Sequence, residues 1–408
     1  MADRPVTSDT LLAAARRTRL HPALAVGIVY VIARLITTTF LIIGVEIANR
    51  ESGGGESLQS LSMRWDGQWY WLVADSGYPS TLPLDGDGNV TQNAWAFLPL
   101  YPALMRVFAV VFGGQYPVAA VFISLVAGYL ACLVFFHLLR DSLGRTAAMW
   151  AVALFAAGPL AVLFQMAYAE SLFLLWLMLA LLALVRRRFG WLHALIPLMG
   201  YTRPGVLAFA LLLGLYGIRR WLRRRDDPLP ATQVVHIVML GLLAAVVGFS
   251  WQVIAGIVTG DPSAYLETEL SWRRGWTGGD GTFVPLSGFI EASAIWFRIW
   301  GLPEVLGYVT LGVLVVGVAA VLLLEPHVRR LDTELRLWSA SYLTYLLLVF
   351  FPQSSIFRLL LPLAPLYGAV AVPKSTAWRV SMLVLGLVGQ WWWIYEMLVQ
   401  GKTFAQIP

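Results

Sequence analysis

The chain has 408 residues, of which 59% are hydrophobic and 13% are charged, and its mean hydropathy is +0.71. These values exclude an ordinary soluble domain and predict an integral membrane protein. The formal net charge of +6 comes from short arginine clusters between apolar runs. Since the sequence contains no continuous basic face, this charge argues against a nucleic-acid partner. The single cysteine, Cys132, excludes an intrachain disulfide.

Apolar runs of the length needed to cross a membrane recur along the chain. The uninterrupted runs are 23–44, 117–139, 146–165, 168–185, 231–257, 304–324, 337–351, 354–372 and 380–400. Two further runs are broken, 96–113 by Pro99 and Pro102, and 191–218 by Thr202-Arg203-Pro204-Gly205. Helices broken at membrane depth are tolerated where they line a cavity. The pattern predicts an all-α, polytopic membrane protein with about ten to eleven hydrophobic segments, forming one transmembrane domain over residues 1–408.

Arginine clusters between these runs predict the orientation, because loops rich in Arg and Lys remain cytoplasmic. The clusters lie at 16–19, 140–145, 186–188, 219–225, 329–336 and 374–379. The first loop, 45–95, and the second, 258–303, then face the other side, provided that 96–113 is re-entrant and 191–218 is a shallow hairpin. The other polar segments on that side are Tyr168-Ala169-Glu170, Thr202-Arg203-Pro204 and Pro352-Gln353-Ser354-Ser355. We therefore expect a multi-pass protein of the cell membrane with a functional site on its extracytoplasmic face.

The first loop contains the most informative carboxylate. Residues 64–71 read Arg-Trp-Asp-Gly-Gln-Trp-Tyr-Trp and closely follow the first apolar run. An ionisable group beside the membrane is costly unless it has a function, so we predict that Asp66 is catalytic. The alternative is a structural pair with Arg64. The flanking Trp65 and Trp69 could stack on a sugar ring or could pack the loop, and the sequence leaves both open.

Several motifs, taken in order, resemble the PIG-V-type mannosyltransferases of the GT-C class. The resemblance covers residues 25–370. The motifs are Arg64-Trp65-Asp66, Gly77-Tyr78, Ala96-Phe97-Leu98-Pro99-Leu100-Tyr101-Pro102, Tyr168-Ala169-Glu170-Ser171-Leu172-Phe173, Thr202-Arg203-Pro204-Gly205 and Phe357-Arg358-Leu359-Leu360-Leu361-Pro362. The chain departs from that family's pattern at Gly67-Gln68, where a small or an acidic residue followed by His is more usual.

This resemblance implies a GT-C-like fold and a membrane glycosyltransferase that moves mannose from a polyprenyl-phosphate-mannose donor. Only two of the 29 basic residues are lysines, which is typical of GC-rich bacterial genomes. A bacterial member of the family would have a glycolipid or a cell-envelope glycan as its acceptor, and membrane lipid around it. Nothing in the motifs separates mannose from another polyprenyl-phosphate sugar such as arabinofuranose.

The chemistry of such a transfer needs few residues. A lipid phosphate is already a good leaving group, so an inverting transfer needs one base for the acceptor hydroxyl and cations for the departing phosphate. The resemblance assigns the base to Asp66. Arginine suits the phosphate because its planar guanidinium donates two parallel hydrogen bonds.

Two arginines inside apolar segments are the first candidates for the phosphate. Arg358 would contact the donor phosphate or, alternatively, pair with a buried carboxylate. Arg203 precedes Pro204 at a helix break, so capping of carbonyl groups or an ion pair with Glu170 is an equally good interpretation. Arg273 and Arg274 would guard the donor entrance or lie at the level of the lipid headgroups.

The remaining candidates are predicted substrate contacts. Glu170 begins an apolar segment, where an acid is favoured by the helix dipole, and it is also a candidate polar group of the site. The complete set of predicted substrate contacts is Arg64, Trp65, Trp69, Tyr78, Tyr101, Glu170, Gln353 and Ser354.

The sequence requires no cofactor and contains no ligand spacing typical of a metal site, although the acidic first loop leaves a divalent cation open. Two other classes of protein are also open. A secondary transporter would have broken helices with arginine at mid-membrane, but also two repeated halves. A non-catalytic subunit of an envelope-assembly complex would not need Asp66.

Overall fold

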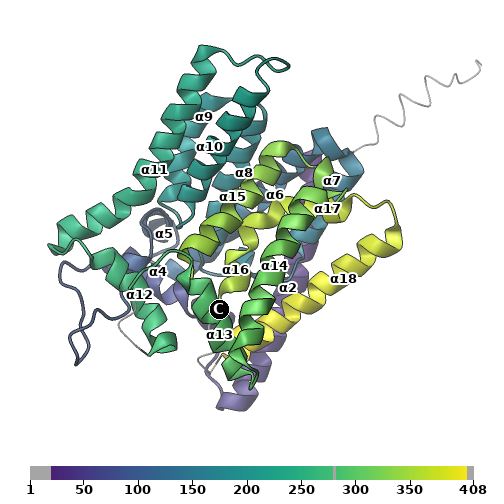
Figure 1. Cartoon of the computed structure of the whole chain (residues 1–408). Coiled ribbons are helices and arrows are strands. Elements are labelled where there is room, and N and C mark those ends of the chain that lie inside the picture. Colours follow the sequence, from purple (N-terminus) through teal and green to yellow (C-terminus); the bar gives the residue numbers. More distant parts are fainter. Residues whose placement is uncertain (1–19, 279–281, 402–408) are drawn as a thin grey trace, which may run out of the picture.

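The computed structural model describes residues 20–278 and 282–401 (Figure 1). Five helical stretches in this part are long and apolar enough to cross a membrane. They are α2 (Pro22–Ser52), α6 (Tyr116–Leu143), α11 (Ala231–Thr259), α14 (Glu304–Leu324) and the continuous pair α18 (Thr376–Trp393) and η5 (Ile394–Gln400). The described residues contain one isolated β-bridge and no strand. The predicted all-α, polytopic membrane fold is confirmed.

Two predicted single helices are wrong. The run 146–165 forms α7 (Arg145–Ala156) and the short helix η2 (Ala161–Gln165), separated by Gly158-Pro159. The run 354–372 forms three short pieces, α16 (Ile356–Leu359), η4 (Leu361–Leu366) and α17 (Tyr367–Ala371). Proline explains both breaks, because it lacks an N–H and its ring clashes with the preceding turn.

The two runs predicted to be broken are indeed discontinuous. The run 191–218 forms α9 (Phe189–Gly200) and α10 (Val206–Leu222), with Gly205 at a φ of +135° between them. The run 96–113 forms η1 (Ala94–Ala96) and α5 (Leu100–Val111). At 1.5 Å per residue, the 12 residues of α5 extend about 18 Å, which is too short to cross the hydrocarbon core.

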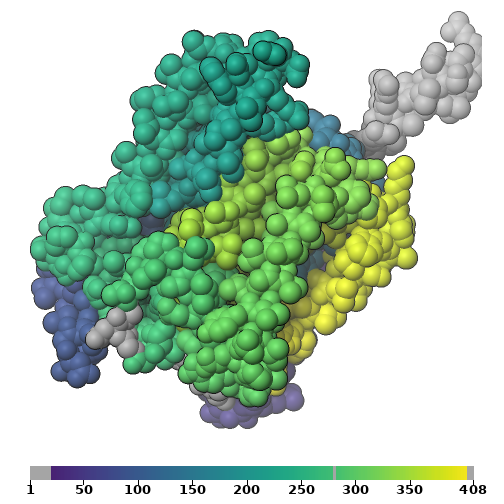
Figure 2. Space-filling view, viewed as in Figure 1, coloured from purple at the N-terminus to yellow at the C-terminus, as the bar shows by residue number. Residues whose placement is uncertain are grey.

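Both predicted loops are largely helical. The first contains α3 (Leu58–Ser62) and α4 (Asp66–Ser76), and it begins later than predicted because α2 continues to Ser52. The second contains α12 (Ala264–Thr277) and α13 (Ser287–Ile299). In Figure 1, α4, α12 and α13 lie toward the same end of the molecule as the carboxyl end of α2. Figure 2 shows α13 and α14 in green at the front of that end, and part of the first loop in blue at the left edge of the view. The side of the membrane that this end faces stays a prediction.

Most helices contribute residues to a common apolar interior. One large buried cluster includes residues of α2, α6, α7 and α10, together with α8 (Glu170–Val185), α15 (Thr333–Val349) and η5. A smaller cluster joins Trp95 of the first loop, and Leu98 just after it, to Trp251 and Ala255 of α11 and Ala264 of α12. The first loop is therefore packed against the helices rather than free in solvent.

A buried arginine stabilises the break between α7 and η2. Arg34 of α2 donates hydrogen bonds of 2.5 Å to the carbonyl oxygens of Ala156 and Ala161. The Ala156 carbonyl lies at the carboxyl end of α7, where the last carbonyl groups have no partner within the helix. The rings of Tyr30 and Phe164 each lie 5.2 Å from its guanidinium carbon. The guanidinium thus takes the place of the missing backbone donors.

We predict that Arg34→Met lowers the thermal unfolding temperature by several degrees. Each carbonyl left unpaired in the interior costs about 1–3 kcal/mol. A matched control is Arg50→Met on the same helix, because the Arg50 side chain is 76% exposed and pairs only with Glu46 across one helical turn. Thermal denaturation in detergent measures both. Equal unfolding temperatures for the two variants would contradict the role of Arg34.

Candidate active site

Four charged side chains from distant segments meet in one row. Arg358 of α16 donates through Nη1 to Oδ2 of Asp66, the first residue of α4. Nε of Arg358 lies 3.4 Å from Oε1 of Glu170, the first residue of α8, and Arg203 pairs with that same oxygen. We call Asp66, Arg358, Glu170 and Arg203 the charged row. Two acids and two arginines give it a formal net charge of zero.

Burial differs along the charged row. The exposed fraction of the side chain is 3% for Glu170, 9% for Arg358, 12% for Arg203 and 22% for Asp66. A buried charge is tolerated when it is paired and hydrogen-bonded, which explains why the acids and arginines occur together. Asp66 therefore has the most exposed side chain of the four.

Local structure places each member of the row. Asp66 and Glu170 both begin helices, where the partial positive charge of the helix amino terminus favours an acid. Arg203 lies in the break between α9 and α10. Arg358 lies in the one-turn helix α16, and the ring of Tyr168 lies 5.3 Å from its guanidinium carbon. Three of the four positions are therefore at helix starts or breaks.

The structure separates the aromatic residues predicted near Asp66. Trp69 follows Asp66 by one turn of α4, stacks on Phe97 at 5.6 Å and meets the edge of Trp272 from α12 at 6.1 Å. Trp65 instead donates from Nε1 to the carbonyl of Met397. Trp69 also borders a surface depression of about 350 Å³. The other residues that line this depression are Leu72, Ser76, Gly77, Tyr78, Pro79, Thr81, Pro83, Gln92, Asn93 and Ala94.

The two predicted tyrosines use their hydroxyl groups inside the protein. Tyr78 donates to the carbonyl of Phe97 at 2.7 Å and stacks on Trp95 at 4.7 Å. Tyr101 is fully buried and donates to the carbonyl of Ala120 at 3.0 Å. These contacts shape the first loop and α5. A role of either tyrosine in substrate binding stays a prediction.

The other predicted arginines have partners outside the charged row. Arg64 pairs with Glu56 at 2.5 Å. Arg273 of α12 pairs with Glu291 of α13, and Arg274 pairs with Glu267 at 2.8 Å. A contact of any of them with a substrate stays a prediction.

The segment between α15 and α16 connects the second loop to the charged row. Gln353 lies with its Nε2 3.5 Å from the carbonyl of Trp272, the neighbour of Trp69. Ser354 is buried four residues before Arg358. Their predicted contacts with substrate are likewise untested, but both lie in the segment that leads to Arg358.

Sequence reasoning missed Glu269 of α12. Its carboxyl group is accessible, yet the protein around it desolvates it and raises its pKa to about 7. A hydrogen bond with Tyr265 opposes this rise, whereas repulsion from Asp66 adds to it. Glu269 therefore lies in the electrostatic field of the charged row. In the sequence Leu-Glu-Thr-Glu-Leu, nothing distinguishes it from Glu267, which pairs with Arg274.

Among the described residues, no group of three or more His, Cys, Asp or Glu side chains is arranged to hold a metal ion. The acidic stretch of the first loop is a turn, in which Oδ1 of Asp85 accepts from the backbone N–H groups of Asp87 and Asn89 at 3.0 and 2.8 Å. These contacts satisfy the Asp85 carboxylate within the loop itself.

Three solved structures of an oligosaccharyltransferase from Archaeoglobus fulgidus are similar to this chain. The complex with Zn and sulfate has 15% identity and a TM-score of 0.45, over 93% of this chain and 53% of that chain. The complex of AglB with an inhibitory peptide and a dolichol-phosphate has 13% identity and a TM-score of 0.42. The form tethered to an acceptor peptide has 13% identity and a TM-score of 0.39. The last two similarities cover 91% of this chain and 56% of those chains. This chain thus spans about half the length of these proteins. No protein-family model and no curated protein sequence matches it.

We predict that Glu269→Gln stabilises the protein in a pH-dependent way. The folded protein holds the Glu269 proton up to pH 7, above its ordinary pKa of 4.5, so wild-type stability falls as pH rises through this interval. Glutamine does not titrate. The unfolding temperature of the variant should therefore match wild type near pH 5 and exceed it by a few degrees at pH 8. A difference that does not change with pH would contradict the raised pKa.

Proposed function

We propose that the chain is an inverting, GT-C-like membrane glycosyltransferase that uses a polyprenyl-phosphate-mannose donor. The observation that carries this proposal is the contact between Asp66 and Arg358, which pairs an accessible carboxylate with a buried arginine from a segment 292 residues away. A base next to a phosphate-binding cation is what transfer from a lipid-phosphate sugar requires. The choice of mannose follows from the PIG-V-type motifs, which include both residues.

The donor phosphate is proposed to bind at Arg358. Its guanidinium has five N–H donors and already contacts two carboxylates, so it can exchange a carboxylate for a phosphate of similar geometry. Arg203 supplies the second cation through the shared Glu170 oxygen. Because the charged row is neutral before the donor arrives, binding of an anionic phosphate releases Asp66 from Arg358.

Asp66, once released, is the proposed base. The acceptor hydroxyl oxygen attacks the anomeric carbon, the bond from that carbon to the phosphate oxygen breaks, and the hydroxyl proton moves to Asp66. One negative charge disappears from the carboxylate as one appears on the leaving phosphate, so the net charge of the site is unchanged. Attack from the face opposite the phosphate turns a β-linked donor into an α-linked product.

The proposed acceptor is a glycolipid or a cell-envelope glycan that reaches Asp66 from the extracytoplasmic side. The depression beside Trp69 supports binding of a sugar near Asp66, because Trp69 lies one helical turn from Asp66 and the depression is lined by uncharged side chains. A Trp ring with neutral hydrogen-bonding groups suits a sugar better than an ionic ligand.

The proposal is tested by sugar transfer with purified protein and its Asp66→Ala variant. The donor is polyprenyl-phosphate-mannose and the acceptors come from a membrane-lipid extract, with products read by mass spectrometry. We expect wild type to add a hexose and the variant to lose at least 10²-fold in rate, because general-base catalysis contributes about 10²–10⁴-fold. NMR of the product should show an α-linkage.

Other outcomes separate the alternatives. Transfer from polyprenyl-phosphate-arabinofuranose alone would keep the mechanism and change the sugar. A product with retained anomeric configuration would contradict the single-base mechanism. Absence of transfer from every donor would favour a transport or assembly protein.

We predict that Asp66→Asn removes transfer yet tightens the binding of polyprenyl phosphate, the released product. Asparagine cannot hold Arg358 in an ion pair and does not repel the phosphate. The gain should be on the order of tenfold, the lower end of what a charge-assisted hydrogen bond contributes. Fluorescence or calorimetric titration in nanodiscs measures it, with Asp75→Asn on the exposed face of α4 as the control. Equal affinity of wild type and Asp66→Asn would contradict the release of Asp66 by phosphate.

A further inference from the structure

The backbone immediately before Asp66 is strained. Trp65 has φ 57° and ψ −117°, a conformation that a residue with a bulky side chain rarely adopts. The next residue, Asp66, begins α4. Such a conformation persists only when surrounding contacts impose it, and it is concentrated at functional sites. The direction of the Asp66 side chain therefore depends on the contacts that hold the backbone at Trp65.

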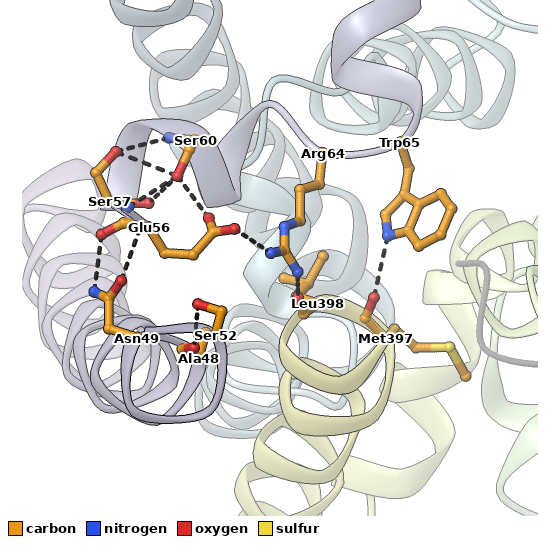
Figure 3. Close-up of polar contacts among 10 residues, drawn as sticks. All are labelled: Ala48, Asn49, Ser52, Glu56, Ser57, Ser60, Arg64, Trp65, Met397 and Leu398. Carbon is orange, nitrogen blue, oxygen red and sulfur yellow. Dashed lines mark hydrogen bonds and ion pairs between the residues drawn. The ribbon is translucent and has the colours of Figure 1, made fainter. Parts of the chain in front are cut away.

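The contacts that hold this turn come from η5 (Figure 3). Nε1 of Trp65 donates to the carbonyl of Met397 at 3.1 Å. Arg64 divides its guanidinium between two partners, with Nη1 on the carbonyl of Leu398 and Nη2 on Oε1 of Glu56 at 2.5 Å. Two consecutive residues are thus bound to two consecutive carbonyl groups of one helical turn.

The helix η5 is suited to this contact. It is a π-helix, a rare geometry that is frequent at functional sites. Its last-turn carbonyl groups would otherwise have no partner, and a cation is favoured at a helix carboxyl end. Gly401 permits the close approach, because a Cβ there would lie 3.1 Å from the Trp65 ring.

Glu56 is itself fixed to the end of α2. Its backbone N–H donates to Oδ1 of Asn49 at 2.8 Å, and its carbonyl accepts from Nδ2 of Asn49 at 3.0 Å. Ser60 donates to the second carboxylate oxygen at 2.8 Å. Figure 3 shows Arg64 lying between this network on one side and η5 on the other.

We propose that Arg64, Trp65 and Glu56 are positioning residues that hold Asp66 in its catalytic direction through their contact with η5. The kinetic part of this proposal rests on the function proposed above. It gives Arg64 a role distinct from substrate binding, since the Arg64 guanidinium is directed at Glu56 and Leu398. Tyr168 adds to the same turn by donating to the carbonyl of Arg64 at 3.0 Å.

The kinetic test uses Arg64→Met, Trp65→Phe and Glu56→Gln, each normalised to folded protein. We expect the turnover number to fall 10–100-fold in the first two, while KM for polyprenyl-phosphate-mannose stays within twofold, because small displacements of a catalytic group cost rate rather than ground-state binding. Arg50→Met is the control, since it removes an exposed arginine from the end of α2. Glu56→Gln in the Arg64→Met background should cause no further loss, because Glu56 acts through Arg64.

A second readout does not need activity. Hydrogen–deuterium exchange of the peptide around Asp66 should quicken in Arg64→Met and Trp65→Phe and stay unchanged in Arg50→Met. If wild type transfers no sugar, the proposed function fails while this exchange measurement still decides the positioning role. Unchanged turnover per folded molecule, or unchanged exchange, in both Arg64→Met and Trp65→Phe would overturn the inference.

Discussion

The pairing of buried charges in the charged row is the constraint on which the rest of this structure depends. Arg358 can lie 91% buried in an apolar protein because the carboxylates of Asp66 and Glu170 are within reach, and Glu170 can be almost fully buried because Arg203 also contacts it. The first loop must therefore fold back to deliver Asp66. The same pairing gives the charged row a formal net charge of zero, and the proposed function has an anionic phosphate exchange with one of its carboxylates.

Broken helices and arginines recur together throughout the molecule. A break removes backbone hydrogen bonds, and a guanidinium has enough donors to replace them inside an apolar interior. Arg34 does so after α7, and Arg379 does so through two contacts with the carbonyl of Ala371 at the end of α17. Arg64 makes the corresponding contact with η5. In the charged row the arginines instead pair with acids.

The sequence predicted what depends on local pattern. Hydropathy was enough for the all-α membrane fold, and Pro204-Gly205 for the break that carries Arg203. The pair of Arg203 with Glu170 was one of two predicted alternatives, and the structure contains it. Pro159, Pro362 and Pro365 also mark breaks, but they stand inside runs whose overall hydropathy favoured single helices.

Long-range pairing could not be predicted in this way. Asp66 was expected either to be the catalytic base or to pair with Arg64. It pairs instead with Arg358, and no periodicity predicts a contact across 292 residues. The same limit applies to Arg64 and η5, which are separated by more than 300 residues. Glu269 could not be identified from the sequence, because the desolvation that raises its pKa arises only in the folded protein.

The most direct measurement for this account is an experimental structure of the protein in nanodiscs with polyprenyl phosphate bound. We predict that the phosphate lies on the guanidinium of Arg358, with the Asp66 carboxylate detached from that arginine and facing open space beside Trp69. A phosphate bound elsewhere, with the contact between Asp66 and Arg358 intact, would contradict it.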